Sequence, residues 1–242
     1  MPQIRAFVSV SRTHVGLSRQ LNEDRYLDRP EIGLWAVADG MGGHQAGDLA
    51  SRLIVEALED IAGSAPAYAR RDAVRRRLEA VNAELIARAA AMPRGTVIGS
   101  TVAVLIAHED HYACVWAGDS RVYLLRGGVL TRVTRDHSLV QELIDGGSLS
   151  EDEARARRIS NVITRAVGAG QVLDLDETHG DIAPGDVFLI CSDGLSGLVR
   201  DEELGQIAAG QDLEAAADRM LDLTLERGAR DNITLTLVRA LG

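Results

Sequence analysis

The chain has 242 residues, of which 46% are hydrophobic and 26% are charged, values typical of a folded protein with a sizeable core. Its formal net charge of −10 argues against nucleic acid as a partner, because proteins that bind nucleic acid normally carry a basic surface. No stretch is long and apolar enough to span a bilayer, so membrane insertion is not expected.

Two cysteines, Cys114 and Cys191, lie inside apolar runs and show no CxxC spacing. This pattern predicts buried, reduced thiols in a reducing compartment. The N-terminal sequence has no signal-peptide core, and the two features together predict a cytoplasmic protein. The sequence also has no heptad repeat, so a monomer is the simplest expectation.

The N-terminal half alternates between strand and helix patterns. Residues 4–10 and 34–38 are each predicted to form a strand, the second one buried. A helix is predicted from Gly47 onward, where apolar residues recur at helical spacing. A second helix is predicted from four apolar residues that share one face: Val74, Leu78, Val81 and Leu85.

Four short strand patterns follow in close succession, at residues 101–107, 112–116, 121–125 and 129–133. Gly127 and Gly128 mark a hairpin turn before the last of them, so a meander of antiparallel strands is expected. Residues 138–165, which have a short helical signal at 139–144, are predicted to form a surface flap.

The C-terminal part has an apolar strand pattern at residues 187–191, a helical face over 213–224 and an alternating strand pattern at 233–238. Strands and helices in this order predict helices packed outside antiparallel sheets. The whole chain, residues 1–242, is therefore expected to form one α+β domain.

Aspartates recur at the ends of these predicted strands. Asp39 follows the apolar run 34–38 and precedes glycines, Asp119 and Asp193 also follow apolar runs, and Asp231 opens the last strand. A buried carboxylate without a partner is costly, and carboxylate oxygens suit Mg²⁺ or Mn²⁺ better than Zn²⁺. Each aspartate alone could serve a turn or a cap. The four together favour a metal site if the strand ends converge.

Eight short motifs, in order along almost the whole chain, resemble those of one enzyme family. The segments are RQLNED (19–24), ADGMGGHQAG (38–47), GST (99–101), GDSR (118–121), DHS (136–138), ITRAVG (163–168), CSDGL (191–195) and DNIT (231–234). They resemble the bacterial single-domain branch of the metal-dependent protein phosphatases, the protein phosphatase 2C family. Residues 33–48 further resemble phosphatases encoded with type VI secretion systems. The resemblance implies a four-layer αββα sandwich of two antiparallel sheets flanked by helices.

The resemblance also implies a set of metal ligands, for two Mn²⁺ or Mg²⁺ ions in a core site and a third ion beside it. By motif match, Asp39 bridges the two core ions, and the carbonyl of Gly40 binds one of them. Asp193 and Asp231 complete their direct ligands. Asp119 helps to hold the third ion.

Further roles follow from the same match. Asp24 and Glu23 act on the ions through bound waters, and Arg19 binds the substrate phosphate through its guanidinium fork. His44 is a candidate proton donor to the leaving group, although it could instead cap the helix that starts near Gly47. Asn232 is expected to orient Asp231. His137 is interpreted as a structural hydrogen-bonding residue.

The function implied is hydrolysis of phosphoserine and phosphothreonine in proteins by a metal-activated water. Such an enzyme opposes a cognate Ser/Thr kinase, here in the regulation of type VI secretion. Two alternatives remain open: a catalytically silent regulator that binds phosphoproteins, and a phosphatase of small phosphoesters. A cysteine phosphatase is excluded, because Gly197 stands where a C-x5-R motif starting at Cys191 would need arginine.

Overall fold

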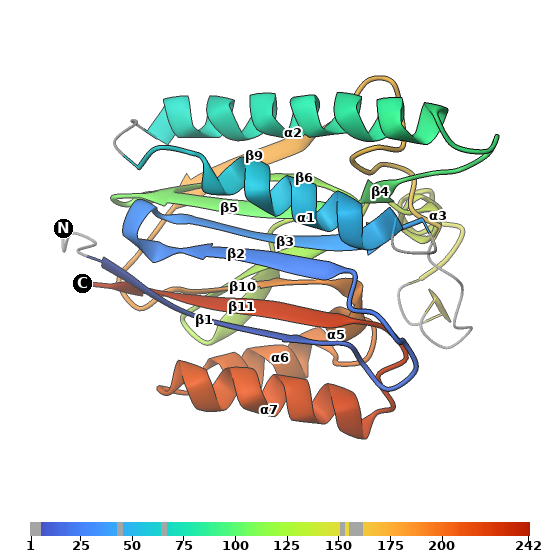
Figure 1. The fold of residues 1–242 in the computed structure, drawn as a ribbon. Helices are drawn as coiled ribbons and strands as arrows, with labels where there is room; N and C mark the ends of the chain where they lie inside the picture. Colours follow the sequence, from blue (N-terminus) through green and yellow to red (C-terminus); the bar gives the residue numbers. More distant parts are fainter. Residues whose placement is uncertain (1–5, 43–45, 64–66, 151–152, 155–161) are drawn as a thin grey trace.

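Two antiparallel β-sheets packed face to face form the centre of the molecule, and helices cover both outer faces (Figure 1). The structure is a computed structural model that describes residues 6–42, 46–63, 67–150, 153–154 and 162–242. The predicted four-layer αββα sandwich is confirmed. None of the helices within these residues is long and apolar enough to cross a membrane.

The first sheet contains both ends of the described chain. Its strand order is β1 (Ala6–His14), β11 (Ile233–Leu241), β10 (Val187–Cys191), β7 (Arg121–Arg126) and β8 (Val129–Arg132). All neighbours in it are antiparallel. The helices α5 (Asp193–Ser196), α6 (Asp201–Ala208) and α7 (Leu213–Glu226) lie on its outer side (Figure 1).

The second sheet faces the first. Its strand order is β2 (Asp24–Arg29), β3 (Leu34–Met41), β5 (Val102–His108), β6 (His111–Ala117) and β9 (Asp176–Asp181), and the short β4 (Gly99–Ser100) pairs with the end of β3. The helices α1 (Ala46–Glu59) and α2 (Ala67–Ala90) cover it, a 3₁₀ turn, η1 (Pro30–Ile32), joins β2 to β3, and α3 (Leu139–Asp145) lies beyond one end of the sandwich (Figure 1).

The apolar run of β3 is continuous because both of its faces are buried. Leu34, Ala36 and Ala38 pack under the helices, whereas Trp35 and Val37 pack between the two sheets. Successive strand residues point to opposite sides, so a central strand covered on both sides has no solvent-facing position left for a polar residue. This packing fixes the strand end at which Asp39 emerges.

The expected meander is wrong in one respect. The four strand patterns form two hairpins in different sheets, β5–β6 in the second and β7–β8 in the first, and the chain crosses over between them at residues 118–120. Gly118 adopts a φ of 111°, and a Cβ on it would lie 2.6 Å from the Cβ of Thr101. Only glycine therefore fits this crossover without strain.

Other elements differ from the sequence prediction in extent. The first strand runs to His14, and residues 4 and 5 of the predicted segment lie outside the described residues. The strands β2 and β9 and the helix α6 have no counterpart among the predicted elements. β2 (DRYLDR) and β9 (DETHGD) are rich in charged residues. They are the two edge strands of the second sheet, so they lack the apolar pattern of inner strands.

Candidate metal centre

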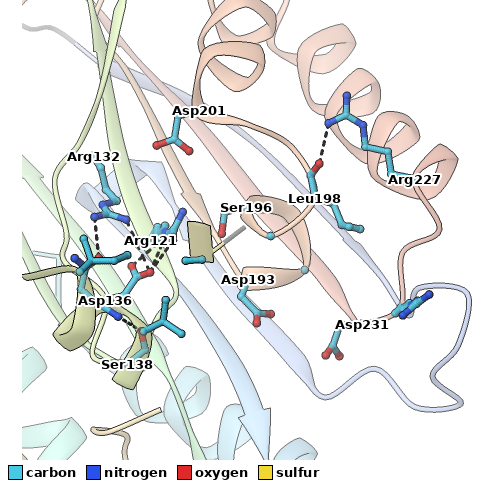
Figure 2. A pocket seen from close by; sticks show the side chains of 17 residues that line it. Arg121, Arg132, Asp136, Ser138, Asp193, Ser196, Leu198, Asp201, Arg227 and Asp231 are labelled. Atoms are coloured by element: carbon cyan, nitrogen blue, oxygen red, sulfur yellow. Dashed lines mark hydrogen bonds and ion pairs between the residues drawn. The ribbon is translucent and has the colours of Figure 1, made fainter. Parts of the chain in front are cut away.

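The predicted aspartates come together at one end of the sandwich. Asp24 and Asp39 are register partners on β2 and β3 of the second sheet. On the first sheet, Asp193 begins α5, with Ser192 between it and the end of β10, Asp231 lies just before β11, and Asp119 lies in the crossover. Figure 2 shows the Asp193 and Asp231 side chains extending from neighbouring segments into the same space. The fold thus gathers carboxylates that are up to 207 positions apart, from Asp24 to Asp231.

Mutual repulsion within this carboxylate cluster is strong. Burial, followed by repulsion from the other four aspartates, raises the pKa of Asp39 well above its usual value. Burial likewise raises the pKa of Asp24 to about 7 and that of Asp119 to about 8. The pKa of Asp193 is raised by burial and by repulsion from Asp231. Without a cation, the folded protein therefore resists full ionisation of this site.

Two buried carboxylate oxygens near the cluster lack a hydrogen-bond donor. Oδ1 of Asp24 and Oε1 of Glu23 have no partner among the described residues, although Oδ2 of Asp24 accepts a 2.8 Å hydrogen bond from Ser192 Oγ. Unsatisfied buried oxygens are rare in folded proteins and call for a water or a cation. Oxygen atoms of several carboxylates are the donors that Mg²⁺ and Mn²⁺ prefer, so the residues present fit such ions.

The side chains of the cluster do not form a complete set of metal ligands. Among the described residues, no three His, Cys, Asp or Glu side chains form a group that could hold a metal ion as they stand. Oδ2 of Asp231 accepts a 2.7 Å hydrogen bond from Nη2 of Arg19. This hydrogen bond is the first cause of the raised pKa of Arg19. A cation at Asp231 would compete with Arg19 for the same oxygen.

Backbone contacts hold Asp39 and Gly40 in place. The amide of Asp39 donates to Thr101 Oγ1 at 3.1 Å, and its carbonyl accepts from Ser100 Oγ at 2.9 Å. A Cβ on Gly40 would collide with the carbonyl oxygen of Gly47 in α1, so glycine here lets the helix start pack directly on β3. His44, the candidate proton donor between them, lies outside the described residues.

Asn232 does more than the sequence indicates. Its amide N–H donates to Asp231 Oδ1 at 2.9 Å, which fits the predicted orienting role. Its side chain also bonds three backbone groups of the loop that precedes β2: Val15 O at 2.8 Å, Leu21 O at 3.0 Å and Glu23 N at 2.8 Å. This loop carries Arg19, so one asparagine positions a carboxylate and the arginine opposite it.

A cavity of about 610 Å³ adjoins the cluster (Figure 2). Asp193 and Asp231 form one side, Ser138 and Gln141 of the flap another, and Leu198 a third. Its remaining wall includes the ion pair of Arg121 with Asp136, in which Nη2 and Oδ2 are 2.6 Å apart. With carboxylates and arginines in its wall, the cavity can receive a polar ligand.

Several residues at the site were not assigned a role from the sequence. They are Ser192, Ser100, Thr101, Asp136 and Asp176, the last of which pairs with His137. Most lie in or next to the GST, CSDGL and DHS motifs, and this proximity was the only sequence feature that indicated a role for them. Asp176 lies in none of the eight motifs and could not have been selected.

Comparison with known proteins gives a consistent result. A family model described as "Protein phosphatase 2C" matches residues 13–241. The serine/threonine protein phosphatase PstP of Mycobacterium tuberculosis is 35% identical over 94% of this chain, which spans only 44% of that protein's length. The serine/threonine phosphatase stp of Listeria monocytogenes is 33% identical over 94% of this chain and 93% of its own length.

Solved structures give the same result. A structure described as "PppA, a key regulatory component of T6SS in Pseudomonas aeruginosa" superposes with a TM-score of 0.91, at 44% identity, over 99% of this chain and all of that one. The catalytic domain of PstP in complex with two manganese ions superposes with a TM-score of 0.86 at 33% identity, over 98% of this chain and 99% of that one.

Proposed function

The chain belongs to the protein phosphatase 2C family, and we propose that it is a metal-dependent protein-serine/threonine phosphatase. The observation that carries the proposal is the convergence of five aspartates, with Asp24 and Glu23 keeping buried oxygens that no described group satisfies. The manganese complex of PstP supports a two-ion site in a related fold. We include residues 1–242 in one catalytic domain.

The metal ligands are assigned as the motifs suggest. Asp39 would be shared by two divalent cations, Mn²⁺ or Mg²⁺, the carbonyl of Gly40, Asp193 and Asp231 would be further ligands, and Asp119 would help to hold a third cation. When bound, such ions lower the pKa of a shared water and stabilise the charge on phosphoryl oxygens. The raised pKa values of Asp39 and Asp193 support this assignment, because bound cations would offset both causes, the burial of the carboxylates and their mutual repulsion.

The protein's other residues orient the substrate and the ligands. Arg19, released from Asp231, has the planar fork that binds a phosphate through two hydrogen bonds. The loop that carries it is held by Asn232. Asp24 and Glu23 act on the ions through waters, and the Ser192 hydroxyl fixes the Asp24 carboxylate. His44 remains our candidate for donating a proton to the departing serine or threonine oxygen.

The partners follow from the same proposal. The substrates are phosphoproteins phosphorylated by a cognate Ser/Thr kinase, and the likeness to PppA supports a role in type VI secretion. We place the enzyme in the cytoplasm as a monomer, and its two unpaired cysteines agree with a reducing compartment. The neighbouring genes provide a direct check: a kinase and secretion genes are expected beside this one, and their absence would remove the support for secretion.

Activity on a phosphopeptide and on small phosphoesters tests the proposed reaction. Hydrolysis of a phosphothreonine peptide is expected with Mn²⁺ and is expected to stop with a chelator. Asp39→Asn should lower kcat by more than about 100-fold, since loss of even an outer partner of a metal ligand typically costs 10–100-fold. Asp222→Asn, a change at an exposed aspartate on α7, is the matched control and should leave kcat unchanged.

The same assay separates the alternatives. Turnover of small phosphoesters at a much higher kcat/KM than phosphopeptides would favour a metabolite phosphatase. Metal-independent binding of the phosphopeptide without turnover would favour a silent regulator. Wild-type turnover by a folded Asp39→Asn variant would contradict the bridging role.

A further inference from the structure

His137 lies where three segments of the chain meet. It is in the connection from β8 to α3, and only 7% of it is exposed. The segments around it are the crossover that carries Asp119, the two ends of the flap, and the first residue of β9. Both backbone polar groups and both ring nitrogens of His137 have partners in these segments. Buried polar groups are normally hydrogen-bonded, so the informative feature is that the partners of this one residue lie in different segments of the chain.

The first contact is with the crossover. The amide of His137 donates to the carbonyl of Gly118 at 2.9 Å, and the amide of Gly118 donates to Nδ1 of the His137 ring at 3.2 Å. His137 therefore holds both polar groups of the residue directly before Asp119. Because Gly118 has a positive φ and no room for a side chain, this pair of bonds sets the direction in which the chain enters Asp119.

The second contact is with the base of the flap. The carbonyl of His137 accepts from the amide of Thr164 at 2.9 Å. Beside it, Ser138 pairs with Ile163, and the amide of Leu139 donates to the carbonyl of Val162 at 2.9 Å. The outgoing and returning ends of the flap are thus joined as a short antiparallel ladder that starts at His137.

The third contact fixes the protonation pattern of the ring. Since Nδ1 accepts a hydrogen bond from a backbone N–H, the ring proton belongs on Nε2. Nε2 lies 3.1 Å from Oδ2 of Asp176, whose Oδ1 accepts from Arg165 at 2.8 Å. Partial burial opposes ionisation of Asp176, but the bond to His137 and the attraction of His137 and Arg165 hold its pKa below the usual value. The ring also stacks on Trp116, with centroids 6.0 Å apart.

We propose that His137 is a positioning residue that ties the Asp119 crossover to the base of the flap, with its ring bonded to Gly118 and its main-chain carbonyl bonded to Thr164, so that cation binding at Asp119 and order at the flap base both depend on how this one residue is held. The tie itself consists of hydrogen bonds between described residues and does not depend on the proposed function. Its effect on a cation rests on the proposed function. Asp39, Asp193 and Asp231 are positioned by other contacts, so the two core ions are expected to be independent of His137.

Two conservative variants separate the contacts of the ring. His137→Asn can keep an acceptor near the Nδ1 position for Gly118 but cannot reach Asp176. His137→Gln can place an N–H near the Nε2 position for Asp176 but loses the acceptor for Gly118. His137→Ala removes both contacts. His179→Asn, a change at an exposed histidine on β9, is the matched control.

Hydrogen exchange of the metal-free protein provides the first measurement. His137→Ala and His137→Gln remove the ring acceptor of the Gly118 amide, whose exchange should accelerate by about tenfold or more if the lost hydrogen bond is worth about 1.4 kcal/mol. Both variants keep the main-chain carbonyl that Thr164 bonds, so exchange of the Thr164 amide should accelerate only because the ring no longer holds residue 137 in place. His137→Asn should stay near the wild-type rates at Gly118. Acceleration at only one of the two segments in His137→Ala would overturn the proposed tie. If His137→Ala fails to fold, the contrast between Asn and Gln decides.

Manganese titration, followed by the electron paramagnetic resonance of free Mn²⁺, provides the second measurement. His137→Gln should weaken the weakest bound ion by about tenfold and change the two tightest by less than about threefold, in line with the loss of an outer partner of a ligand. Equal weakening of all ions, or of none, would overturn the link to Asp119. If the wild-type chain bound no Mn²⁺, the proposed function would fail, and the exchange rates would still decide whether the tie exists.

Discussion

Nη2 of Arg19 lies 2.7 Å from Oδ2 of Asp231, so the arginine proposed to bind the substrate phosphate is hydrogen-bonded to a proposed metal ligand. Both side chains are about half exposed, at 51% and 44%. An exposed ion pair contributes little to stability, so it can be exchanged for other partners at small cost. Cation binding at Asp231 would release Arg19 toward the substrate, which couples loading of the metal site to phosphate binding.

We therefore expect Arg19→Ala to raise KM for phosphopeptides by about tenfold or more, since hydrogen bonds to charged groups are worth about 1.5–3 kcal/mol. Arg19→Lys should recover only part of this loss, because lysine cannot bind phosphate through a planar fork. The unfolding free energy should change by no more than about 1 kcal/mol in either variant. A KM that stays at the wild-type value in Arg19→Ala, measured by steady-state kinetics, would exclude a role in phosphate binding.

Metal addition should stabilise the fold. Binding to the native state alone adds about 2.7 kcal/mol when the free ion is at 100 times its dissociation constant. Asp24→Asn should have two effects of opposite sign: it removes a buried charge and so stabilises the protein when no metal is added, but it reduces the stability gained from Mn²⁺. Thermal unfolding with and without Mn²⁺ measures both. Equal gains from Mn²⁺ in the wild type and in Asp24→Asn would argue against any role of this carboxylate at the ions.

The pH dependence of the metal-free protein has a defined sign. The pKa of Asp24 is raised from 3.8 to about 7 on folding, so between these values the native state binds more protons than the unfolded state. Stability should therefore fall as pH rises from about 4 to about 7, and the fall should be smaller in Asp24→Asn. Urea unfolding in the presence of a chelator at several pH values tests this. A flat or rising profile over that window in the wild type would contradict the raised pKa.

The two thiols should be inert in the native protein. Cys114 and Cys191 are both buried, and burial raises the pKa of Cys191 to about 12 and that of Cys114 further. Only thiolate reacts with a disulfide reagent, so modification should be slow until the chain unfolds and then reach two thiols per chain. Titration with a chromogenic disulfide before and after adding guanidinium measures this. Rapid labelling of the native protein would show that one thiol is accessible.

Gly118 and Gly127 offer a matched pair of backbone tests. Both have positive φ, 111° and 57°, but a Cβ on Gly127 would meet nothing within 4 Å, whereas on Gly118 it would meet Thr101. Gly127→Ala should cost about 1 kcal/mol of strain, and Gly118→Ala should cost more because a clash is added. Chemical unfolding gives both values. Equal costs would mean that Thr101 can move aside and that the crossover is not tightly packed.

Much of the fold could be predicted from local patterns. The apolar run 34–38, the helical faces and the hairpin at Gly127 all occur as predicted. Each is encoded within a short stretch of sequence, by the spacing of apolar residues or by the turn residues. The charged strands β2 and β9 could not be predicted in this way. Their backbones pair with β3 and β6, whereas their side chains carry no apolar period.

The sequence by itself determined which carboxylates could carry the chemistry, since a charge at the end of a buried strand is costly unless it has a partner. The tertiary structure alone decided the partners. Arg19 meets Asp231 across 212 positions, and His137 meets Asp176 across 39, with nothing in the local sequence to indicate either pair. Polar contacts of this kind depend on how strand ends and loops are brought together by sheet pairing, and a single sequence records only the local part of that arrangement.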